Sequence, residues 1–227
     1  MCRRSRPPPR TTPTRLSDRA VAERTQLHAL LGDALVAHLR VTVTRGEASY
    51  PLVLPTAFAV DPDGPDEGGT LYLHGSTGAG WLRAALRSDV CVTVTELDGL
   101  VLARSSFHHS MNYRSAVVIG RPRLVEEAAE RGRALDLIVD HLVPGRAATL
   151  RASTRKELAA TAVIALPLQE ASMKARAGGP VDDPDDLALG VWAGEIPLRR
   201  VALSPVSAED SHDDVPVDVA TRAAALA

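Results

Sequence analysis

The chain has 227 residues with 26 basic and 28 acidic side chains, and its formal net charge is −2. Because these charges nearly cancel, the composition gives no general attraction to nucleic acid or to an anionic membrane, and an aromatic content of 3% leaves few rings for stacking bases. The 45% of hydrophobic and 24% of charged residues are typical of a soluble globular protein, and no apolar run approaches the roughly 20 residues of a membrane-spanning helix. Cys2 lies in a polar tail and Cys91 in an apolar run, which predicts no structural disulfide.

The N-terminal region predicts a tail followed by one helix. Residues 1–15 are rich in Pro, Arg and Thr without apolar periodicity, which indicates a disordered tail, either solvated or in contact with an acidic partner. No apolar segment follows the first basic residues, as it would in a secretory signal, so we expect a cytoplasmic protein. From Ser17, which can cap a helix, to Gly32, apolar residues recur at nearly helical spacing.

Two strands rich in β-branched residues and leucine are expected next, at 34–44 and 50–60, with a turn between them. Pro51 and Pro55 cannot donate hydrogen bonds to a neighbouring strand, so the second strand should lie at a sheet edge or contain a bulge. Residues 61–69, rich in Pro and Gly, form a hairpin loop into the next strand.

The stretch from Thr70 to Arg83 joins a strand to a helix through small residues. Its glycines allow an anion to approach the backbone, its hydroxyls can donate hydrogen bonds, and a helix that starts near Ala79 would point free N–H groups at the same place. These residues are Gly75, Ser76, Thr77, Gly78 and Gly80, with Arg83 in the first turn of the helix. The alternative is an ordinary turn in which His74 is hydrogen-bonded.

The rest of the chain predicts a meander of strands followed by helices. Strands are expected at 90–95 and 100–107, with a turn at 96–99, and at 113–120 with a ladder that continues through Leu124 and Val125. Helices are expected at 126–142 and 157–161, and a last strand at 161–168. This order predicts a mainly β fold with helices (α+β), a small β-barrel with a packed interior. The folded domain would span 16–203, and the acidic, alanine-rich residues 204–227 would be a flexible tail or a frayed helix.

The run Asp98–Val118 resembles the pyridoxamine 5′-phosphate oxidase-related, FMN-binding split-barrel family, in its branch of nitroimidazole-resistance-like flavoproteins. Four further segments match in the expected order, so the resemblance covers residues 16–203: Pro55-Thr56, Leu73–Ser76, Ser172–Arg176 and Trp192–Leu198. The resemblance implies a homodimer of split barrels with two FMN molecules at the subunit interface, each in contact with both chains.

The resemblance also implies a set of cofactor-binding residues. They are Pro55, Thr56, His74, Gly75, Ser76, Thr77, Trp81, Leu82, Arg83, Asn112, Tyr113, Arg114, Ser115, Lys174 and Trp192. Relatives often carry a basic residue near the helix start, where this chain has Gly80 and Trp81. The phosphate would then depend on Arg83, the two hydroxyls and backbone N–H groups, and a deazaflavin- or haem-using relative is the alternative.

Alternation along a strand limits which of these residues share a ligand. Tyr113 and Ser115 lie on one face of their strand and Asn112 and Arg114 on the other. We favour Tyr113 and Ser115 pointing inward and Arg114 bonding the partner subunit. The alternative is a tyrosine in the barrel core and an arginine at the surface.

The remaining candidates each have two interpretations. His74 is the candidate for a catalytic residue, either bonding the flavin edge or donating a proton to substrate, or else it is a turn histidine. Lys174 either reaches phosphate or is solvated, and Trp192 packs near the flavin or only within the dimer interface. His108 and His109 are neighbours with no Cys, Asp or third His at ligand spacing, so no metal site is predicted.

The sequence thus predicts an FMN-dependent oxidoreductase that acts on a small molecule, with the flavin carrying the redox chemistry. Two alternatives stay open: a flavin-binding or storage protein without turnover, and a haem- or deazaflavin-using relative. The substrate cannot be named from the sequence.

Overall fold

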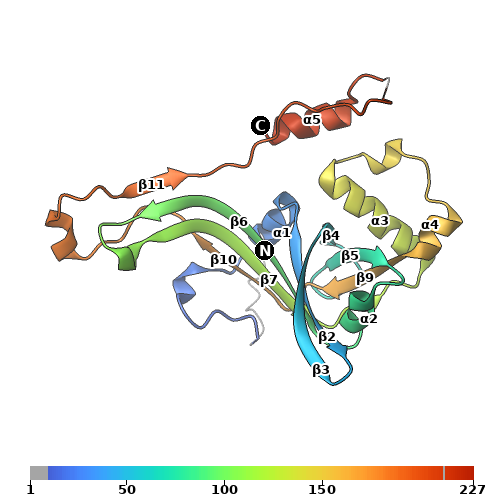
Figure 1. Ribbon diagram of the computed structural model, residues 1–227, viewed down its shortest axis with the longest axis horizontal. Coiled ribbons are helices and arrows are strands. Elements are labelled where there is room, and N and C mark those ends of the chain that lie inside the picture. Colours follow the sequence, from blue (N-terminus) through green and yellow to red (C-terminus); the bar gives the residue numbers. More distant parts are fainter. Residues whose placement is uncertain (1–9, 212) are drawn as a thin grey trace.

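The computed structural model describes residues 10–211 and 213–227, and two antiparallel sheets form its body (Figure 1). Within these residues the larger sheet has seven strands in the order β1-β10-β7-β6-β2-β3, with β11 paired to β6, and the smaller sheet has the order β4-β5-β9-β8. The strands are β1 (Ala20–Val21), β2 (Ala37–Arg45), β3 (Ala48–Thr56), β4 (Phe58–Asp61), β5 (Thr70–Ser76), β6 (Val90–Leu102), β7 (Ser110–Gly120), β8 (Arg123–Leu124), β9 (Thr161–Pro167), β10 (Ala171–Arg176) and β11 (Gly194–Pro197). The helices are α1 (Arg24–Asp33), α2 (Gly80–Ala85), α3 (Ala128–Leu142), α4 (Arg155–Ala160) and α5 (Val217–Ala225), with 3₁₀ turns η1 (Ser17–Arg19), η2 (Ser106–His108), η3 (Ala147–Thr149) and η4 (Pro184–Ala188). The predicted α+β class is confirmed.

One face of the larger sheet is apolar. On β2, Leu39 and Val41 are buried, whereas the alternating residues His38 and Arg40 are exposed, because successive side chains point to opposite faces. The buried face continues through Val92 and Val94 of β6, Ala116 and Val118 of β7, and Met173 of β10. It packs against α1, α2 and one face of the smaller sheet, which together form the main core.

The chain passes from the larger to the smaller sheet at Ala57. Thr56 of β3 pairs with Ala37 of β2, but Phe58 of β4 pairs with Leu73 of β5. The single strand predicted at 50–60 is therefore wrong. The prediction that its prolines mark a sheet edge is confirmed, because β3 is the last strand of the larger sheet.

Strand β6 runs without a break from Val90 to Leu102, so the predicted turn at 96–99 is wrong. The polar residues there form a bulge, which shifts the register between Leu97 and Gly99. The carboxylate of Asp98 accepts hydrogen bonds from Nε and Nη2 of Arg114 at 3.1 and 3.0 Å.

Other strand predictions fail because the strands that pair with each other lie far apart in sequence. Strand β8 pairs with β9 in the smaller sheet and does not extend the ladder of β7. The strand expected last, at 161–168, is β9, and both β10 and β11 follow it. The helix expected from Ser17 begins only at Arg24, because Ala20 and Val21 pair with β10 instead.

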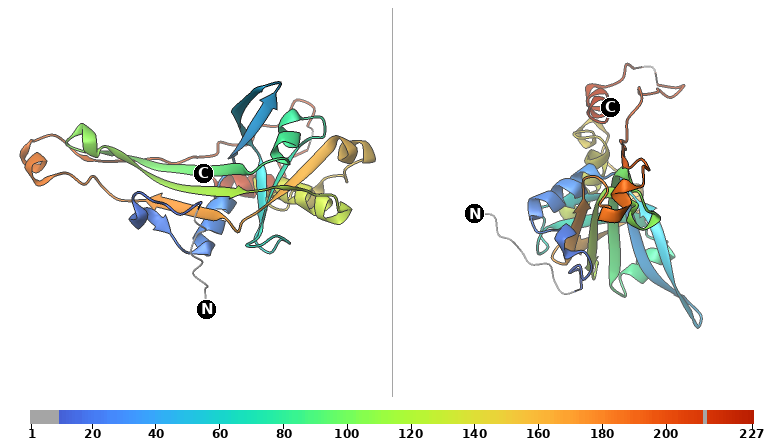
Figure 2. Two further views of the ribbon diagram at one scale, coloured as in Figure 1. Left: turned by 90° about the horizontal axis from the view of Figure 1, so that it is seen from below. Right: turned by 90° about the vertical axis from the view of Figure 1, so that its left-hand side faces the viewer.

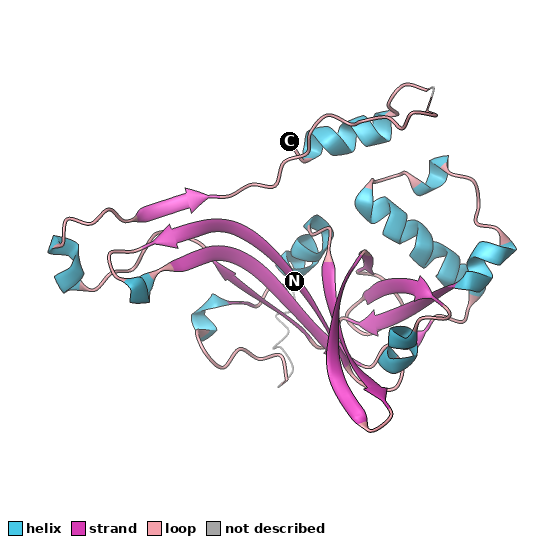
Figure 3. Ribbon diagram, viewed as in Figure 1, coloured by secondary structure: helices cyan, strands magenta, loops and turns pink. Residues whose placement is uncertain are grey.

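Helix α3 covers the second face of the smaller sheet (Figure 3). Its buried residues Ala134 and Ile138 pack against Tyr72 of β5 and Val163 of β9 in a second core cluster. A polar network reinforces this contact, because Arg123 of β8 bonds Glu130 of α3, and the hydroxyl of Tyr72 donates to the same carboxylate at 3.0 Å.

The distal halves of β6 and β7 extend away from the body with β11 beside them (Figures 1 and 2). We call this extension, residues 97–113 and 177–198, the arm. Turns η2 and η4 lie at its tip. Several large apolar side chains of the arm are exposed, namely Leu100, Phe107, Met111, Trp192 and Ile196.

Both terminal regions contact the body where the structure describes them. The guanidinium of Arg10 pairs with Asp89 and Glu170 at 2.5 and 2.6 Å, whereas the disorder predicted for residues 1–9 concerns positions outside the described residues. Residues predicted as a C-terminal tail contain α5, where Arg222 donates to the carbonyl of Leu142 at 2.8 Å. Among the described residues, no helix is both long and apolar enough to cross a membrane.

Candidate functional site

A cavity of about 750 Å³ lies between the β2–β3 hairpin and α2. It is lined by Thr42, Val43, Thr44 and Arg45 of β2, Tyr50 and Leu52 of β3, Gly80, Trp81, Arg83 and Ala84 of α2, and the following Arg87 and Ser88. Its walls thus combine two aromatic rings, four hydroxyl groups and three guanidinium groups. Such a mixture of apolar surface and a few convergent polar groups is typical of a small-molecule site.

The three arginines of the cavity have no carboxylate partner among the described residues. Several other arginines of the described chain are paired with carboxylates: Arg123, for example, bonds both Asp66 and Glu130. Within the described residues, the single hydrogen bond that the cavity arginines form goes from Nη1 of Arg83 to the carbonyl oxygen of Gly78 at 3.5 Å. Three unpaired cations around one cavity favour an anionic ligand, and a guanidinium suits phosphate because it can donate two parallel hydrogen bonds.

The indole of Trp81 forms one wall of the cavity and lies directly over Gly75. A Cβ atom at position 75 would lie 2.5 Å from Cζ2 of Trp81, which is closer than any normal contact. Gly75 is therefore required for the close approach of the ring to β5, and its position in the predicted glycine stretch has a packing reason.

The predicted phosphate turn has its polar groups in use within the chain. His74, Gly75 and Ser76 end β5 and pair with β9. The hydroxyl of Ser76 accepts a hydrogen bond from the Gly78 N–H at 3.3 Å, and the Thr77 N–H and hydroxyl both donate to the carbonyl of Ala160. Helix α2 starts after Ala79, as predicted, but it has only six residues.

The other predicted residues of this turn and of α2 do not all line the cavity. Trp81 and Arg83 line the cavity, whereas Leu82 is 4% exposed and belongs to the main core. Nδ1 of His74 is buried and has no hydrogen-bond partner in the described chain. The structure thus retains Trp81 and Arg83 as candidate ligand contacts and leaves the role of His74 a prediction.

Tyr113 and Ser115 share a face, as predicted, but it is the face turned away from the core. Ala116 and Val118 fill the core side of β7, so the inward orientation expected for Tyr113 and Ser115 is wrong. Alternation was correctly predicted, but the sequence did not show which set faces the core, because Tyr113 is as suitable for a core as alanine.

Lys174 and Pro55 belong to the same outer surface of the larger sheet. Register places Ser115 beside Lys174 of β10 and Thr95 of β6, while Pro55 and then Thr56 end the edge strand β3. Nζ of Lys174 donates to the carbonyl of Arg15 at 2.9 Å. A second cavity of about 320 Å³ is lined by residues 10–15 and by Ser115, Val117, Ser172 and Lys174.

Of the last three predicted residues, Asn112 and Trp192 lie in the arm and Arg114 directly follows it in the chain. Asn112 is 6% exposed, and its amide donates to Glu195 at 2.7 Å and accepts from Arg176, so both ends are engaged within the chain. Arg114 pairs with Asp98 of its own chain. Trp192 is 65% exposed, and its ring lies over Gly194, where a Cβ would approach Cζ2 to 2.7 Å.

The fifteen predicted residues therefore do not converge on one point of a single chain. Some lie in the cavity beside α2 or in the turn before it, others on the outer face of the larger sheet or on and beside the arm, and Leu82 lies in the main core. The prediction missed Arg45, Arg87 and Tyr50, which complete the cavity. A hint was present in Arg45, which begins the predicted turn between two strands and so had to lie at a hairpin end.

The two sheets place the chain in the split-barrel class of proteins, as comparison with known proteins shows. The model of the family described as pyridoxamine 5′-phosphate oxidase matches residues 23–175. The chain belongs to this family, which confirms the resemblance found in its sequence. None of the curated proteins matches the chain.

Solved structures similar to this chain also support its membership of the family. The flavocytochrome Anf3 from Azotobacter vinelandii is 35% identical with a TM-score of 0.85, and the match covers 95% of this chain and 97% of that one. The FAD- and haem-binding protein from Mycobacterium smegmatis is 38% identical with a TM-score of 0.79, covering 90% and 97%. A candidate 5-nitroimidazole antibiotic resistance protein from Bacteroides thetaiotaomicron is 22% identical, covers 68% and 85%, and shares the fold with a TM-score of 0.54.

Proposed function

We propose that the protein is a flavin-dependent oxidoreductase acting on a small molecule, and that the phosphate of its flavin binds the arginines of the cavity beside α2. The observation that carries this proposal is the gathering of Arg45, Arg83 and Arg87, none of which pairs with a carboxylate in the described chain. A phosphate brings one to two negative charges per group and would be held by charge-assisted hydrogen bonds.

The cavity also fits the rest of such a ligand. Its volume of about 750 Å³ is within the usual range for cofactor sites, and Trp81 and Tyr50 provide ring surfaces for a planar group. The flavin would supply the redox chemistry, while the protein orients it and restricts access of water. The name flavocytochrome borne by the Azotobacter neighbour supports a redox role.

Two observations bear on which flavin binds, and they favour different forms. The sequence resemblance implies FMN, whereas the Mycobacterium neighbour is named for binding FAD. FAD has two phosphates, which the three arginines would suit better than the single phosphate of FMN. Extraction of the purified protein followed by chromatography of the released flavin distinguishes FMN, FAD and a deazaflavin directly.

Removing one cavity arginine tests the site. In the variant Arg83→Ala, loss of a charge-assisted hydrogen bond should weaken FMN or FAD binding about ten- to a hundredfold and riboflavin binding far less. Arg155→Ala is the matched control, because Arg155 is an exposed helical arginine outside every described cavity. Equal weakening of riboflavin and the phosphorylated flavins would move the phosphate away from this cavity.

Turnover needs its own test, because a flavin-storage protein would bind equally well. Flavin absorption that bleaches under NADH or NADPH and returns in air supports the oxidoreductase. A yellow protein that no pyridine nucleotide reduces supports storage instead. Riboflavin titration alone would not separate these two functions.

A second candidate, a protein that binds haem as well as flavin, is favoured by the names of the Azotobacter and Mycobacterium structures reported above. Haem iron needs an axial side chain such as an imidazole with a free nitrogen. Within the described residues, His38 and His74 form no hydrogen bond, and His38 is exposed on the outer face of the larger sheet. A Soret band that weakens in His38→Ala or His74→Ala would support this candidate, and its absence after haem addition would contradict it.

We further propose that the protein acts as a homodimer with the flavin at the subunit interface. The exposed apolar side chains of the arm support a second copy as its partner, since a thin extension of strands buries little surface by itself. The separation of the predicted site residues also supports it, because the arm and the cavity beside α2 lie on different parts of one chain (Figure 1), and a second copy could bring their residues together. Cytoplasmic location stays a prediction from the sequence.

A further inference from the structure

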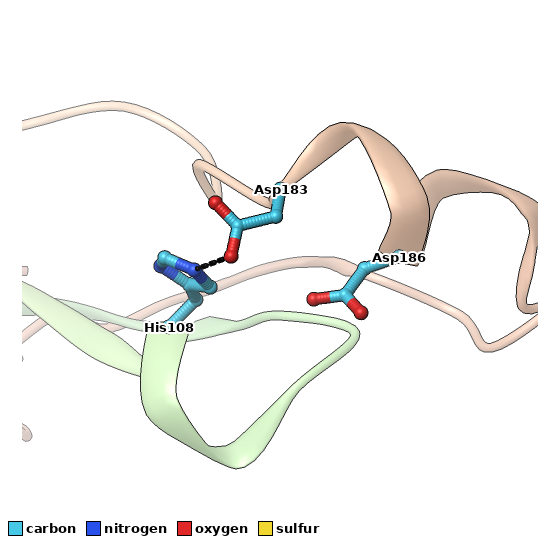
Figure 4. A group of neighbouring side chains, drawn as sticks. All are labelled: His108, Asp183 and Asp186. Atoms are coloured by element: carbon cyan, nitrogen blue, oxygen red, sulfur yellow. Dashed lines mark hydrogen bonds and ion pairs between the residues drawn. The ribbon is translucent and has the colours of Figure 1, made fainter.

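Three ligating side chains meet at the tip of the arm, although they come from two distant connections of the chain. His108 ends η2, between β6 and β7, while Asp183 and Asp186 flank the start of η4, between β10 and β11. One ligand atom from each lies within 4.8 Å of the others, and Figure 4 shows the three side chains directed toward a shared space. We propose that this group binds a divalent transition-metal ion of the zinc class, which holds the two connections together.

The two carboxylates of this group have fewer cationic neighbours than negative charges. Asp182, next in sequence, is neutralised by Arg104, whose Nη1 and backbone N–H bond its carboxylate at 2.7 and 2.8 Å. Among the described residues, the one partner of the Asp183 carboxylate is Nε2 of His108, at 3.2 Å. The carboxylate of Asp186 has no hydrogen bond or ion pair within the described part of the chain. Two carboxylates therefore share one imidazole, and a divalent cation would balance their charge.

The backbone already brings the two carboxylates to the same side. Asp183 occupies the N-cap position of η4, and the N–H of Asp186 donates to the carbonyl oxygen of Asp183 at 3.0 Å. This hydrogen bond fixes the distance between the two residues across the first turn of η4. Pro184 restricts φ at the first position of this turn, which reduces the entropy lost when the ligands are ordered.

The opposite side of the site is also fixed by the protein. Nδ1 of His109 bonds the carbonyl oxygen of Ser105 at 2.8 Å, which closes the turn that carries His108. The ring of Phe107 packs edge-on against the imidazole with centroids 5.1 Å apart. Asp182 is 2% exposed at its side chain and anchors the second connection through Arg104. Both halves of the site are therefore positioned before any ion binds.

The donor set decides the class of ion. One imidazole nitrogen and two carboxylate oxygens suit Zn²⁺ and similar transition metals, whereas Ca²⁺ and Mg²⁺ prefer oxygen donors alone. Three protein ligands leave further positions for water, and the Asp183 side chain, 74% exposed, leaves a path for the ion to enter. This arrangement stabilises the arm and does not depend on the flavin site.

Metal titration of the intact protein, stripped with a chelator and with its flavin bound, tests the proposal. With Zn²⁺ in calorimetry and Co²⁺ in visible absorption, we expect one high-affinity ion per chain. The variants His108→Gln and Asp186→Asn should each weaken binding about tenfold or more, because each removes a direct ligand. Flavin absorption should not change, since the tip is outside the cavity.

Asp185→Asn is the matched control, because Asp185 has the same charge and lies beside Asp186 but is not part of the group. Wild-type affinity in this variant, with loss in Asp186→Asn, supports the site. Equal loss in both variants would mean that the ion only associates with the acidic segment, and no binding to the wild-type chain would overturn the proposal outright.

Discussion

At the scale of single residues, the contact between Gly75 and Trp81 joins the sequence pattern to the candidate site. The glycine-rich stretch suggested a backbone that approaches an anion, but its first glycine instead admits an indole ring. That ring is a wall of the cavity, so the position of β5 determines the shape of the site.

Gly75→Ala should therefore disturb both stability and binding. The new Cβ would lie 2.5 Å from Cζ2 of Trp81, so the ring must move, and such overpacking costs about 1–3 kcal/mol of the free energy of unfolding. Gly78→Ala is the control, because the nearest atom to its Cβ would be 3.7 Å away. Urea unfolding of both variants measures the difference. A Gly75→Ala protein as stable as the wild type would show that the indole moves freely.

At the scale of elements, the network around Arg123 fixes α3 to the smaller sheet. Hydrogen bonds from Arg123 lower the pKa of Glu130 below its usual value. Burial raises the pKa of Asp66, but hydrogen bonds from Arg123 and Thr70 outweigh it, so this pKa is also lowered. Since both carboxyls bind protons less tightly in the folded than in the unfolded chain, they stabilise the fold above the unfolded pKa values of about 4.

This stabilisation should be lost as pH falls below about 4 and through the lowered folded-state pKa values. Arg123→Gln should reduce the free energy of unfolding at neutral pH by about 1–3 kcal/mol, and should also flatten its decline at acid pH. Denaturant titrations across this pH range measure both effects. Arg151→Gln, which breaks the exposed pair with Glu157, should change stability little. An unchanged acid slope in Arg123→Gln would contradict the role of the network.

The strands show why part of the structure could be predicted from the sequence and part could not. Alternation and turn residues located most strands because both signals are local. The change of sheet at Ala57 had no such signal, because Phe58 and Ala59 are both buried and continue the apolar run. Likewise, the contact between His108 and Asp183 depends on two connections meeting in space, so ligand spacing in the sequence could not show it.

At the scale of the whole molecule, the proposed dimer would link assembly to cofactor binding through the arm. If two chains bury their arms against each other and share the flavin, dimer and cofactor stabilise one another by mass action. Flavin at a hundred times its dissociation constant should then add about 2.7 kcal/mol to stability, and the thermal midpoint should rise with protein concentration. Thermal unfolding at several flavin and protein concentrations measures both dependences.

Introducing a charged side chain on the arm tests whether the flavin site needs the dimer or lies within one chain. Met111 is 51% exposed on β7, so Met111→Glu should leave the fold of one chain intact but place a charge in the dimer interface, weakening association by about thirtyfold or more if the position is a hot spot. Val206→Glu is the control, because Val206 is 94% exposed outside the arm. Sedimentation and flavin titration should show both properties falling together in Met111→Glu alone. A monomeric variant with wild-type flavin affinity would place the whole flavin site within one chain, in the cavity beside α2.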